Sequence, residues 1–343
     1  MKTHHQLVNQ NSNNLRSIAS SSVDLIVTSP PYPMIEMWDS IFINQDPTIS
    51  NALALGQGVI VFEKMHRILD RVWSECDRVL SHNGFICINI GDATRTVNGV
   101  FHLFPNHARI ISVFMNMGGY CLLPDIHWRK RCNTPTKFMG SGMYPAGAYV
   151  TYEHEYILIF RKGGKRLFDK QRQSLRRESA YFWEERNTWF SDLWDVRGIP
   201  QPLPATSTRK RSGAFPFEIP FRLINMYSIK QDTVLDPFCG LGTTLLACMA
   251  TERNSIGVEL DKSVFDLAKK SLSVSHSALN QIIAERLQYH KSFIDSLSPD
   301  KRKRCYLNRH HGFLVKTRQE TDLSLRFLSA VTPVTDGFEC TYL

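Results

Sequence analysis

The segment 233–259 constrains the fold of this chain most. A short apolar strand at 233–236 runs into a glycine-rich loop, a helix follows from Leu245, and a second strand occupies 255–259. Two strands joined through a helix lie parallel, since antiparallel neighbours need only a short turn. The sequence therefore predicts an α/β fold whose parallel sheet carries a nucleotide-binding half.

The acidic and glycine residues of this segment indicate a ligand with a ribose and a positive charge. Glu259 lies about 20 residues beyond Gly240, where an acidic side chain can bind ribose hydroxyls. The loop lacks the third glycine of a dinucleotide site, because Leu245 stands there. A carboxylate at Asp236 would repel a pyrophosphate. S-adenosylmethionine fits these features better than a dinucleotide.

A second motif, Ser29-Pro30-Pro31-Tyr32, follows the apolar run 23–28, which predicts a buried strand. The prolines fix φ near −65° and remove two backbone donors. The stiff loop offers hydroxyl and carbonyl acceptors beside an aromatic ring, which suits a nucleobase with an exocyclic amino group. A proline-rich turn with a packed tyrosine is the alternative interpretation of this motif alone.

The two motifs together resemble the DNA amino-methyltransferases, which methylate exocyclic nitrogens of cytosine or adenine. The catalytic motif precedes the cofactor motif by about 200 residues, an order that resembles the beta group of that family. Over roughly residues 7–270, the resemblance implies a Rossmann-like S-adenosylmethionine-dependent methyltransferase fold with circularly permuted motif order. It also implies a basic DNA-recognition insertion, to which a helical C-terminal extension is added.

The resemblance implies specific roles for both motifs. The Ser29 hydroxyl and the Pro30 carbonyl would accept the amino hydrogens of a flipped-out base, and Tyr32 would stack on its ring. Serine at position 29 usually accompanies N4 of cytosine in this family and aspartate N6 of adenine, so N6-adenine methylation is the alternative. The implied catalytic residues are Ser29, Pro30, Pro31 and Tyr32, and the implied cofactor contacts are Phe215, Pro216, Asp236, Pro237, Phe238, Gly240, Gly242, Thr243, Thr244 and Glu259.

At one place this chain departs from the pattern of the family that it resembles. Relatives often carry an acidic residue about a dozen residues before the catalytic strand, whereas this chain has Gln10-Asn11-Ser12 there. An adenine contact from Asn11 is the expectation at that place. Asp24 is interpreted as part of the start of the strand rather than as a general base.

The positive charge of the chain is concentrated in residues 129–211. This segment has 17 Lys and Arg against 8 Asp and Glu, an excess equal to the net charge of +9 of the whole chain. Localised charge of this kind indicates a polyanionic partner, here double-stranded DNA, although a solvated surface is the alternative. The predicted DNA contacts are Arg129, Lys130, Arg131, Lys137, Lys162, Lys165, Arg209 and Lys210.

The motifs and the charge distribution divide the chain into four predicted parts. The catalytic half covers 1–128, the basic segment 129–212, the cofactor-binding half 213–270 and the C-terminal extension 271–343. Residues 6–22 are predicted to hold a polar segment with a weak helix, and 263–294 are predicted to be helical from their apolar spacing.

Several classes of protein are disfavoured. No apolar run is long enough for a bilayer and no signal peptide is visible, so a cytoplasmic protein is expected. The eight cysteines lack metal-ligand spacing, so no metal site is predicted. No Pro-Cys dipeptide occurs, which disfavours a ring-carbon cytosine methyltransferase. A catalytically inactive DNA-binding protein remains the alternative of another class, and a cognate restriction endonuclease is a possible genetic partner.

Overall fold

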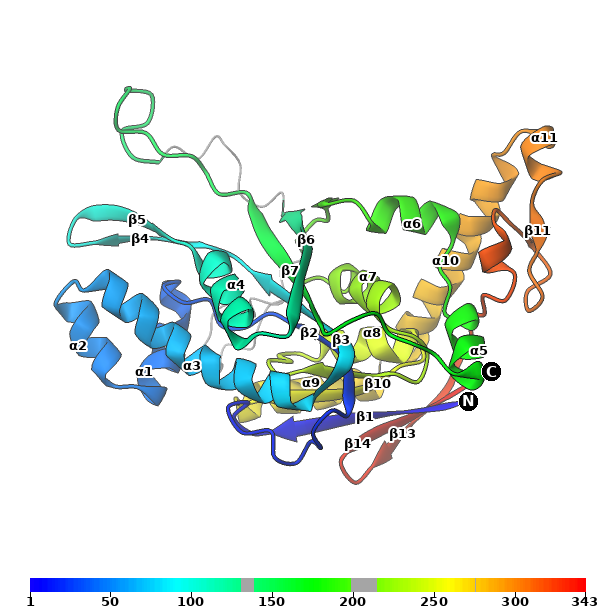
Figure 1. The fold of residues 1–343 in the computed structure, drawn as a ribbon, viewed down its shortest axis with the longest axis horizontal. Helices are drawn as coiled ribbons and strands as arrows, with labels where there is room; N and C mark the ends of the chain where they lie inside the picture. Colours follow the sequence, from blue (N-terminus) through cyan, green and yellow to red (C-terminus); the bar gives the residue numbers. More distant parts are fainter. Residues whose placement is uncertain (131–138, 199–214, 275) are drawn as a thin grey trace.

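The computed structural model describes residues 1–130, 139–198, 215–274 and 276–343. Within these residues the centre of the molecule is a ten-stranded sheet (Figure 1). Its strands, in order across the sheet, are β13 (Leu328–Val334), β14 (Gly337–Tyr342), β1 (Lys2–Asn9), β10 (Asn254–Glu259), β9 (Thr233–Asp236), β2 (Val23–Thr28), β3 (Leu80–Ile90), β7 (His154–Lys162), β6 (Tyr120–Arg129) and β8 (Leu193–Asp195).

The middle of the sheet is parallel, as the sequence predicts. Strands β1, β10, β9, β2 and β3 run in one direction, while β7 is antiparallel to β3 and β6 is antiparallel to β7. The strand that precedes Ser29 therefore lies directly beside the cofactor strand β9, although 208 residues separate Thr28 from Asp236 in the chain. The carboxyl ends of β2, β3, β9 and β10 meet at one edge.

Alternating side chains of the central strands supply two hydrophobic layers. In β2, Ile26 packs into the core on one face, while Leu25 and Val27 pack into the core on the other. Helices α1 (Asp39–Gln45), α2 (Thr48–Ala54), α3 (Gly58–Val79) and α4 (Asn106–Met117) cover the first face. Helices α7 (Glu218–Tyr227), α8 (Thr243–Ala250), α9 (Lys262–Val274) and α10 (His276–Asp295) cover the second.

The remaining elements are short. The 3-10 helix η1 (Glu36–Trp38) follows the catalytic motif, and the hairpin of β4 (Ala93–Val97) and β5 (Val100–Phe104) projects from the sheet (Figure 1). The others are α5 (Lys170–Glu178), α6 (Trp183–Trp189), α11 (Pro299–Arg302), η2 (Arg318–Glu320), and the paired strands β11 (Tyr306–Leu307) and β12 (Leu314–Val315).

The helix expected within residues 6–22 is wrong, because strand β1 runs to Asn9 and residues 10–22 form turns and irregular structure. The inward positions of β1 begin with polar residues, Thr3 and His5, which hides the alternation of a strand. Hydrogen bonds satisfy both side chains: His5 Nδ1 lies 2.8 Å from Ser255 Oγ, and Thr3 Oγ1 lies 2.8 Å from the Tyr342 hydroxyl. Partners from the distant C-terminal half of the chain therefore allow this polar strand to be buried.

The stretch 263–294 that was predicted to be helical forms α9 and α10, but the rest of the C-terminal extension is not a continuous helix. Strands β13 and β14 form a hairpin whose two-residue turn is Thr335-Asp336, and β14 pairs with β1 to extend the sheet. Strands from all four predicted parts thus join one sheet, and the four-part division stays a prediction. No helix among the described residues is long and apolar enough to span a membrane.

Candidate active site

The loop that follows β2 lies at the carboxyl edge of the parallel strands. Ser29 and Pro31 line a pocket at this edge, whereas Pro30 and Tyr32 are buried behind them. The Tyr32 ring is 7% exposed and belongs to the hydrophobic core. The ring is therefore buried although it lies in a loop, because neighbouring strands pack against it, and its stacking on a base stays a prediction.

The Tyr32 hydroxyl takes part in a buried polar network. It donates a hydrogen bond to Glu155 Oε2 at 2.8 Å and lies 3.0 Å from Ser29 Oγ. The Asn89 amide nitrogen lies 2.7 Å from both the Tyr32 hydroxyl and Glu155 Oε2. Burial and the adjacent Glu155 carboxylate raise the pKa of Tyr32 well above its usual value, so the hydroxyl keeps its proton.

Asn106 at the start of α4 holds the other end of the catalytic loop. Its side-chain amide donates to the carbonyls of Pro33 and Gly91, at 3.1 and 3.0 Å, and Asn106 is fully buried. His66 Nε2 lies 2.9 Å from Asn106 Oδ1. Desolvation lowers the pKa of His66 to about 3, so a neutral imidazole donates this bond and orients the amide. The sequence analysis missed both residues.

Asp236 connects the two motifs. Its Oδ1 accepts hydrogen bonds from the Thr28 hydroxyl at 2.7 Å and from the Phe238 amide at 3.0 Å, and its Oδ2 accepts one from the Thr244 hydroxyl at 2.6 Å. Burial raises the pKa of Asp236 to about 6 despite these donors. The Asp236 carboxylate thus connects β2, which leads into the Ser29 loop, to β9, and it also lines the pocket.

Glu259 ends β10, the neighbouring parallel strand, and is 6% exposed. Its Oε2 accepts a hydrogen bond from the Gly240 amide at 3.0 Å, and its Oε1 accepts one from the Asp261 amide at 2.8 Å. Glycine at 240 suits the loop because its φ is +52°. Each carboxylate oxygen can accept a second hydrogen bond, so Glu259 can bind the loop and a ribose hydroxyl together.

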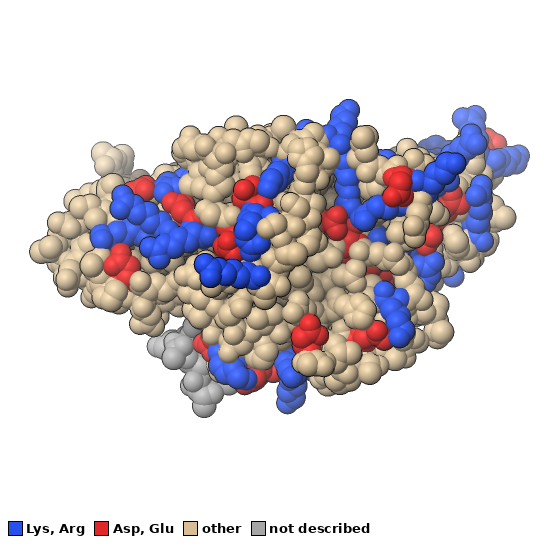
Figure 2. Space-filling model, turned by 60° about the horizontal axis from the view of Figure 1, so that its bottom comes forward, with Lys and Arg blue, Asp and Glu red and all other residues tan. Residues whose placement is uncertain are grey.

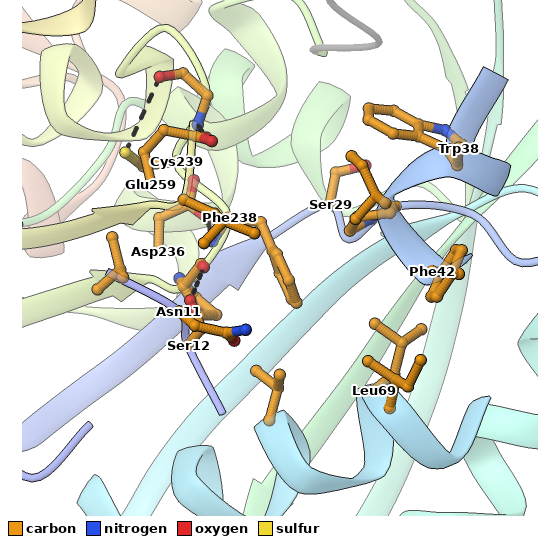
Figure 3. Close-up of a pocket in the computed structure, with 18 of the residues that line it drawn as sticks. Asn11, Ser12, Ser29, Trp38, Phe42, Leu69, Asp236, Phe238, Cys239 and Glu259 are labelled. Atoms are coloured by element: carbon orange, nitrogen blue, oxygen red, sulfur yellow. Dashed lines mark hydrogen bonds between the residues drawn. The ribbon is translucent and has the colours of Figure 1, made fainter. Parts of the chain in front are cut away.

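The pocket at this edge brings the two motifs together (Figure 3). Glu259, Cys239, Phe238 and Asp236 lie on one side, and Ser29, Trp38, Phe42 and Leu69 lie across from them. The predicted cofactor residues that line it are Phe215, Asp236, Pro237, Phe238, Gly240, Thr243 and Glu259, whereas Pro216, Gly242 and Thr244 do not.

The sequence analysis did not predict part of the pocket wall, because the residues that form it come from segments outside the two motifs. Asn11 lines it, with its amide donating to Gln45 Oε1 at 3.1 Å, and its contact with adenine stays a prediction. The Ser12 hydroxyl donates to the Pro237 carbonyl. The residues without a sequence signal are Trp38, Ile41 and Phe42 beside the catalytic loop and Ile68, Leu69 and Val72 of α3. Their apolar character was visible, but only the packing of α1 and α3 shows that they face a pocket.

Lys162 and Lys165, both predicted DNA contacts, lie away from the pocket edge of the sheet. Strand β7 is antiparallel to β3, so its last residue, Lys162, lies near the start of β3 and away from Ser29. The Lys162 ammonium donates to the Asp77 carbonyl at 2.6 Å and pairs with its carboxylate at 2.9 Å. Lys165 lies just beyond, exposed. This position follows from the strand direction, which composition does not reveal, and the DNA contact of both lysines stays a prediction.

Much of the basic excess is used within the fold. Arg166 pairs with Asp24 at 2.8 Å and with Asp232 at 2.5 Å, and Arg172 pairs with Asp232 as well. Asp24 therefore stabilises the start of β2, as the sequence analysis expected. On the face shown in Figure 2, Lys and Arg side chains lie among Asp and Glu side chains.

Arg129 and Lys130 lie at the carboxyl end of β6, on the same edge as the pocket. The Arg129 guanidinium lies 3.6 Å from Glu153, with its side chain 58% exposed. The Lys130 ammonium is paired with Glu155 and lies 5.0 Å from the centre of the Trp128 ring. The other predicted DNA contacts, Arg131, Lys137, Arg209 and Lys210, lie outside the described residues.

Comparison with known proteins identifies the family. The model of the DNA methylase family, which covers N6 and N4 enzymes, matches residues 23–270. The chain belongs to this DNA methylase family. It is 48% identical over 330 residues to the type II methyltransferase M.MthZI of Methanothermobacter thermautotrophicus, covering 95% of this chain and 91% of that protein. It is 45% identical over 291 residues to the type II methyltransferase M.MjaI of Methanocaldococcus jannaschii, covering 81% and 94%.

Solved structures show the same fold. A putative DNA modification methylase of Thermus thermophilus, in complex with S-adenosyl-L-methionine, is 31% identical with a TM-score of 0.60, and the match covers 78% of this chain and 93% of that one. The cytosine-N4-specific PvuII DNA methyltransferase has a TM-score of 0.51 at 17% identity, covering 83% and 94%. The sheet described above is thus a Rossmann-like methyltransferase fold, as predicted.

Proposed function

We propose that this chain is a site-specific DNA methyltransferase that transfers a methyl group to N4 of a flipped-out cytosine in double-stranded DNA. The observation that carries the proposal is the shared pocket: Ser29 and Pro31 line the same cavity as Asp236, Phe238 and Glu259. A methyl acceptor and a methyl donor must meet for transfer to occur, and the Thr28–Asp236 hydrogen bond holds their two loops side by side.

S-adenosyl-L-methionine is the methyl donor. The residues present fit its parts: Glu259 can accept ribose hydroxyls, Phe215 and Phe238 offer apolar surfaces for an adenine ring, and Asp236 and Glu259 make the pocket favourable to a cation. The bound group supplies an electrophilic methyl on a sulfonium. The protein supplies the binding and the orientation.

The catalytic loop supplies acceptors where an amino group would enter. An exocyclic amine is a poor nucleophile because its lone pair is delocalised into the ring. Hydrogen bonds from the amine to the Ser29 hydroxyl and the Pro30 carbonyl would hold the nitrogen toward the methyl group and favour its pyramidal form. The amino group is unreachable inside a duplex, so the base has to leave the stack.

Serine at position 29 supports cytosine over adenine, since the serine form of this motif usually accompanies N4-cytosine enzymes. The N6-adenine alternative keeps the same loop geometry and the same cofactor. An inactive DNA-binding protein is disfavoured, because Ser29, Asp236 and Glu259 line one pocket, Tyr32 contacts Ser29 from behind it, and their hydrogen bonds are in place. The relatives named type II methyltransferases support a role in a restriction-modification system, with a cognate endonuclease as genetic partner.

Nucleoside analysis of the reaction product tests the proposal. Unmethylated duplex DNA is incubated with the protein and S-adenosyl-L-methionine, digested to nucleosides and separated by mass spectrometry. We expect N4-methylcytosine with the native chain and none with Ser29→Ala. N6-methyladenine alone would overturn the assignment of the base, and 5-methylcytosine alone would overturn the mechanism. Methylome mapping of DNA from expressing cells then gives the recognised site.

A further inference from the structure

Glu155 of β7 lies at the catalytic loop although it is about 120 residues away in the chain. It is 6% exposed, and its two carboxylate oxygens face different partners. Oε2 accepts hydrogen bonds from the Tyr32 hydroxyl at 2.8 Å and the Asn89 amide at 2.7 Å, and Oε1 pairs with the Lys130 ammonium. A buried carboxylate with this many partners is fixed in position.

The backbone of Gly91 allows this close packing. A Cβ at Gly91 would lie 3.0 Å from Cε2 of Tyr32 and 3.2 Å from Cγ of Glu155, tighter than ordinary contact. The Tyr32 ring and the Glu155 side chain therefore pack directly against the backbone of Gly91, which follows the end of β3. The hydroxyl and the carboxylate are held together by packing as well as by their hydrogen bond.

The donors and acceptors of this network can be assigned by counting hydrogens. The Tyr32 hydroxyl has one hydrogen, and it goes to the Glu155 carboxylate, which can only accept. Asn89 Nδ2 can only donate, so at 2.7 Å the Tyr32 oxygen is its acceptor. At the 3.0 Å contact between Ser29 Oγ and the Tyr32 hydroxyl, Ser29 is therefore the donor. The single Ser29 hydrogen points to Tyr32, which leaves the Ser29 lone pairs as acceptors.

We propose that Glu155 is a positioning residue that sets this hydrogen-bond direction, so that Ser29 presents lone pairs to the target amino group. The inference rests on the proposed function, in which Ser29 accepts an N–H bond from the base. Without the Glu155 carboxylate, Tyr32 is free to donate to Ser29. The Ser29 hydrogen then turns toward the pocket, where it opposes the amino hydrogens.

Lys130 makes Glu155→Gln the informative substitution. The ammonium attracts the amide oxygen of the new side chain, so the amide nitrogen faces Tyr32 and Asn89. A donor then replaces an acceptor at the Tyr32 hydroxyl while size and shape are kept. The pairing also gives Lys130 a role in holding Glu155, in addition to the DNA contact predicted from sequence.

The test is steady-state kinetics of tritium transfer from labelled S-adenosyl-L-methionine to duplex DNA. For Glu155→Gln we expect kcat to fall at least about 10-fold, as for the loss of a charge-assisted hydrogen bond. KM for DNA and Kd for the cofactor should stay within about 2-fold of the native values, because the defect lies in orienting the amine. Glu339→Gln is the matched control, because it removes the charge of a β14 carboxylate that pairs with Lys2 of β1 at 2.7 Å, outside the site.

A double-mutant cycle separates positioning from a structural role. If Glu155 acts through the Tyr32 hydroxyl, Glu155→Gln should have no further effect on kcat in a Tyr32→Phe background. A merely structural carboxylate would lower kcat by the same factor in both backgrounds, which would overturn the inference. A native kcat for Glu155→Gln, or a loss confined to KM, would overturn it too.

The native chain decides whether the proposed function itself stands. If the native protein transfers no label to DNA, the proposed function fails and the inference fails with it. If the native protein is active and the Glu155→Gln variant matches it, only the inference fails. Thermal unfolding of each variant in the presence of cofactor shows whether lost activity reflects lost folding.

Discussion

Replacing Thr28 with valine should break the hydrogen bond that joins the catalytic strand to the cofactor strand. Thr28 is fully buried, and its hydroxyl donates to Asp236 Oδ1 at 2.7 Å. Valine has nearly the same shape, so the change removes one donor without opening a large cavity. Asp236 keeps the Phe238 amide and the Thr244 hydroxyl as donors. The fold should therefore persist with lower stability.

The size of the loss follows from the charge on the acceptor. A hydrogen bond to a charged group contributes roughly 1.5–3 kcal/mol, so Thr28→Val should lower the free energy of unfolding by about 2 kcal/mol at about pH 7.5. Thr28→Ser is the matched control, because it keeps the hydroxyl and loses one buried methyl, worth about 0.8 kcal/mol.

The pH dependence of the loss identifies its cause. The Thr28 bond favours the ionised carboxylate, and burial raises the folded pKa of Asp236 to about 6. The Thr28→Val penalty should be largest well above this pKa, where Asp236 is ionised in both proteins. It should decrease as the pH falls toward about 6 and Asp236 takes up a proton, first in the variant, whose pKa is higher. The Thr28→Ser penalty comes from a methyl group and should not change with pH.

Urea unfolding at about pH 7.5 and about pH 5 measures both quantities, with the native chain compared at each pH. We expect the midpoint to shift without a change in slope. Equal losses for valine and serine at the higher pH, or a valine penalty that does not depend on pH, would refute this account of the Thr28–Asp236 bond.

Three further outcomes are expected. Glu259→Gln should raise the Kd for S-adenosyl-L-methionine about 10- to 100-fold while DNA binding is kept, since a neutral amide replaces the carboxylate; unchanged affinity in calorimetry would contradict that assignment. Substitution of Lys162 and Lys165 with alanine should leave the salt dependence of DNA binding unaltered, because both lie away from the pocket edge; a slope reduced by about one per lysine would place them at phosphates. Asn106→Ala should lower stability by about 1–3 kcal/mol and also lower kcat, because two buried loop carbonyls lose their donor; native values in denaturation and label-transfer assays would show that the loop is held elsewhere.

The motif residues were predictable because their chemistry is local. Prolines stiffen the loop at 29–32, and glycine with a φ of +52° suits the loop at 240 wherever the chain folds. The expectation that Asp24 belongs to the start of the strand also holds, although its partners Arg166 and Asp232 come from distant segments. The sequence did not show where side chains lie in space, such as the distance of Lys162 from the pocket edge or the burial of Tyr32.

The sequence by itself determined the α/β fold class, the two motifs and their order, because period, turn residues and glycines act over a few neighbouring positions. Only the tertiary structure decided which side chains meet. Glu155, Asn89 and Asn106 reach the catalytic loop from other strands and helices, and no spacing in the chain encodes those contacts. Strand direction likewise decided that Arg129 lies on the pocket edge and Lys162 on the opposite one, because an antiparallel strand reverses the order of its residues across the sheet.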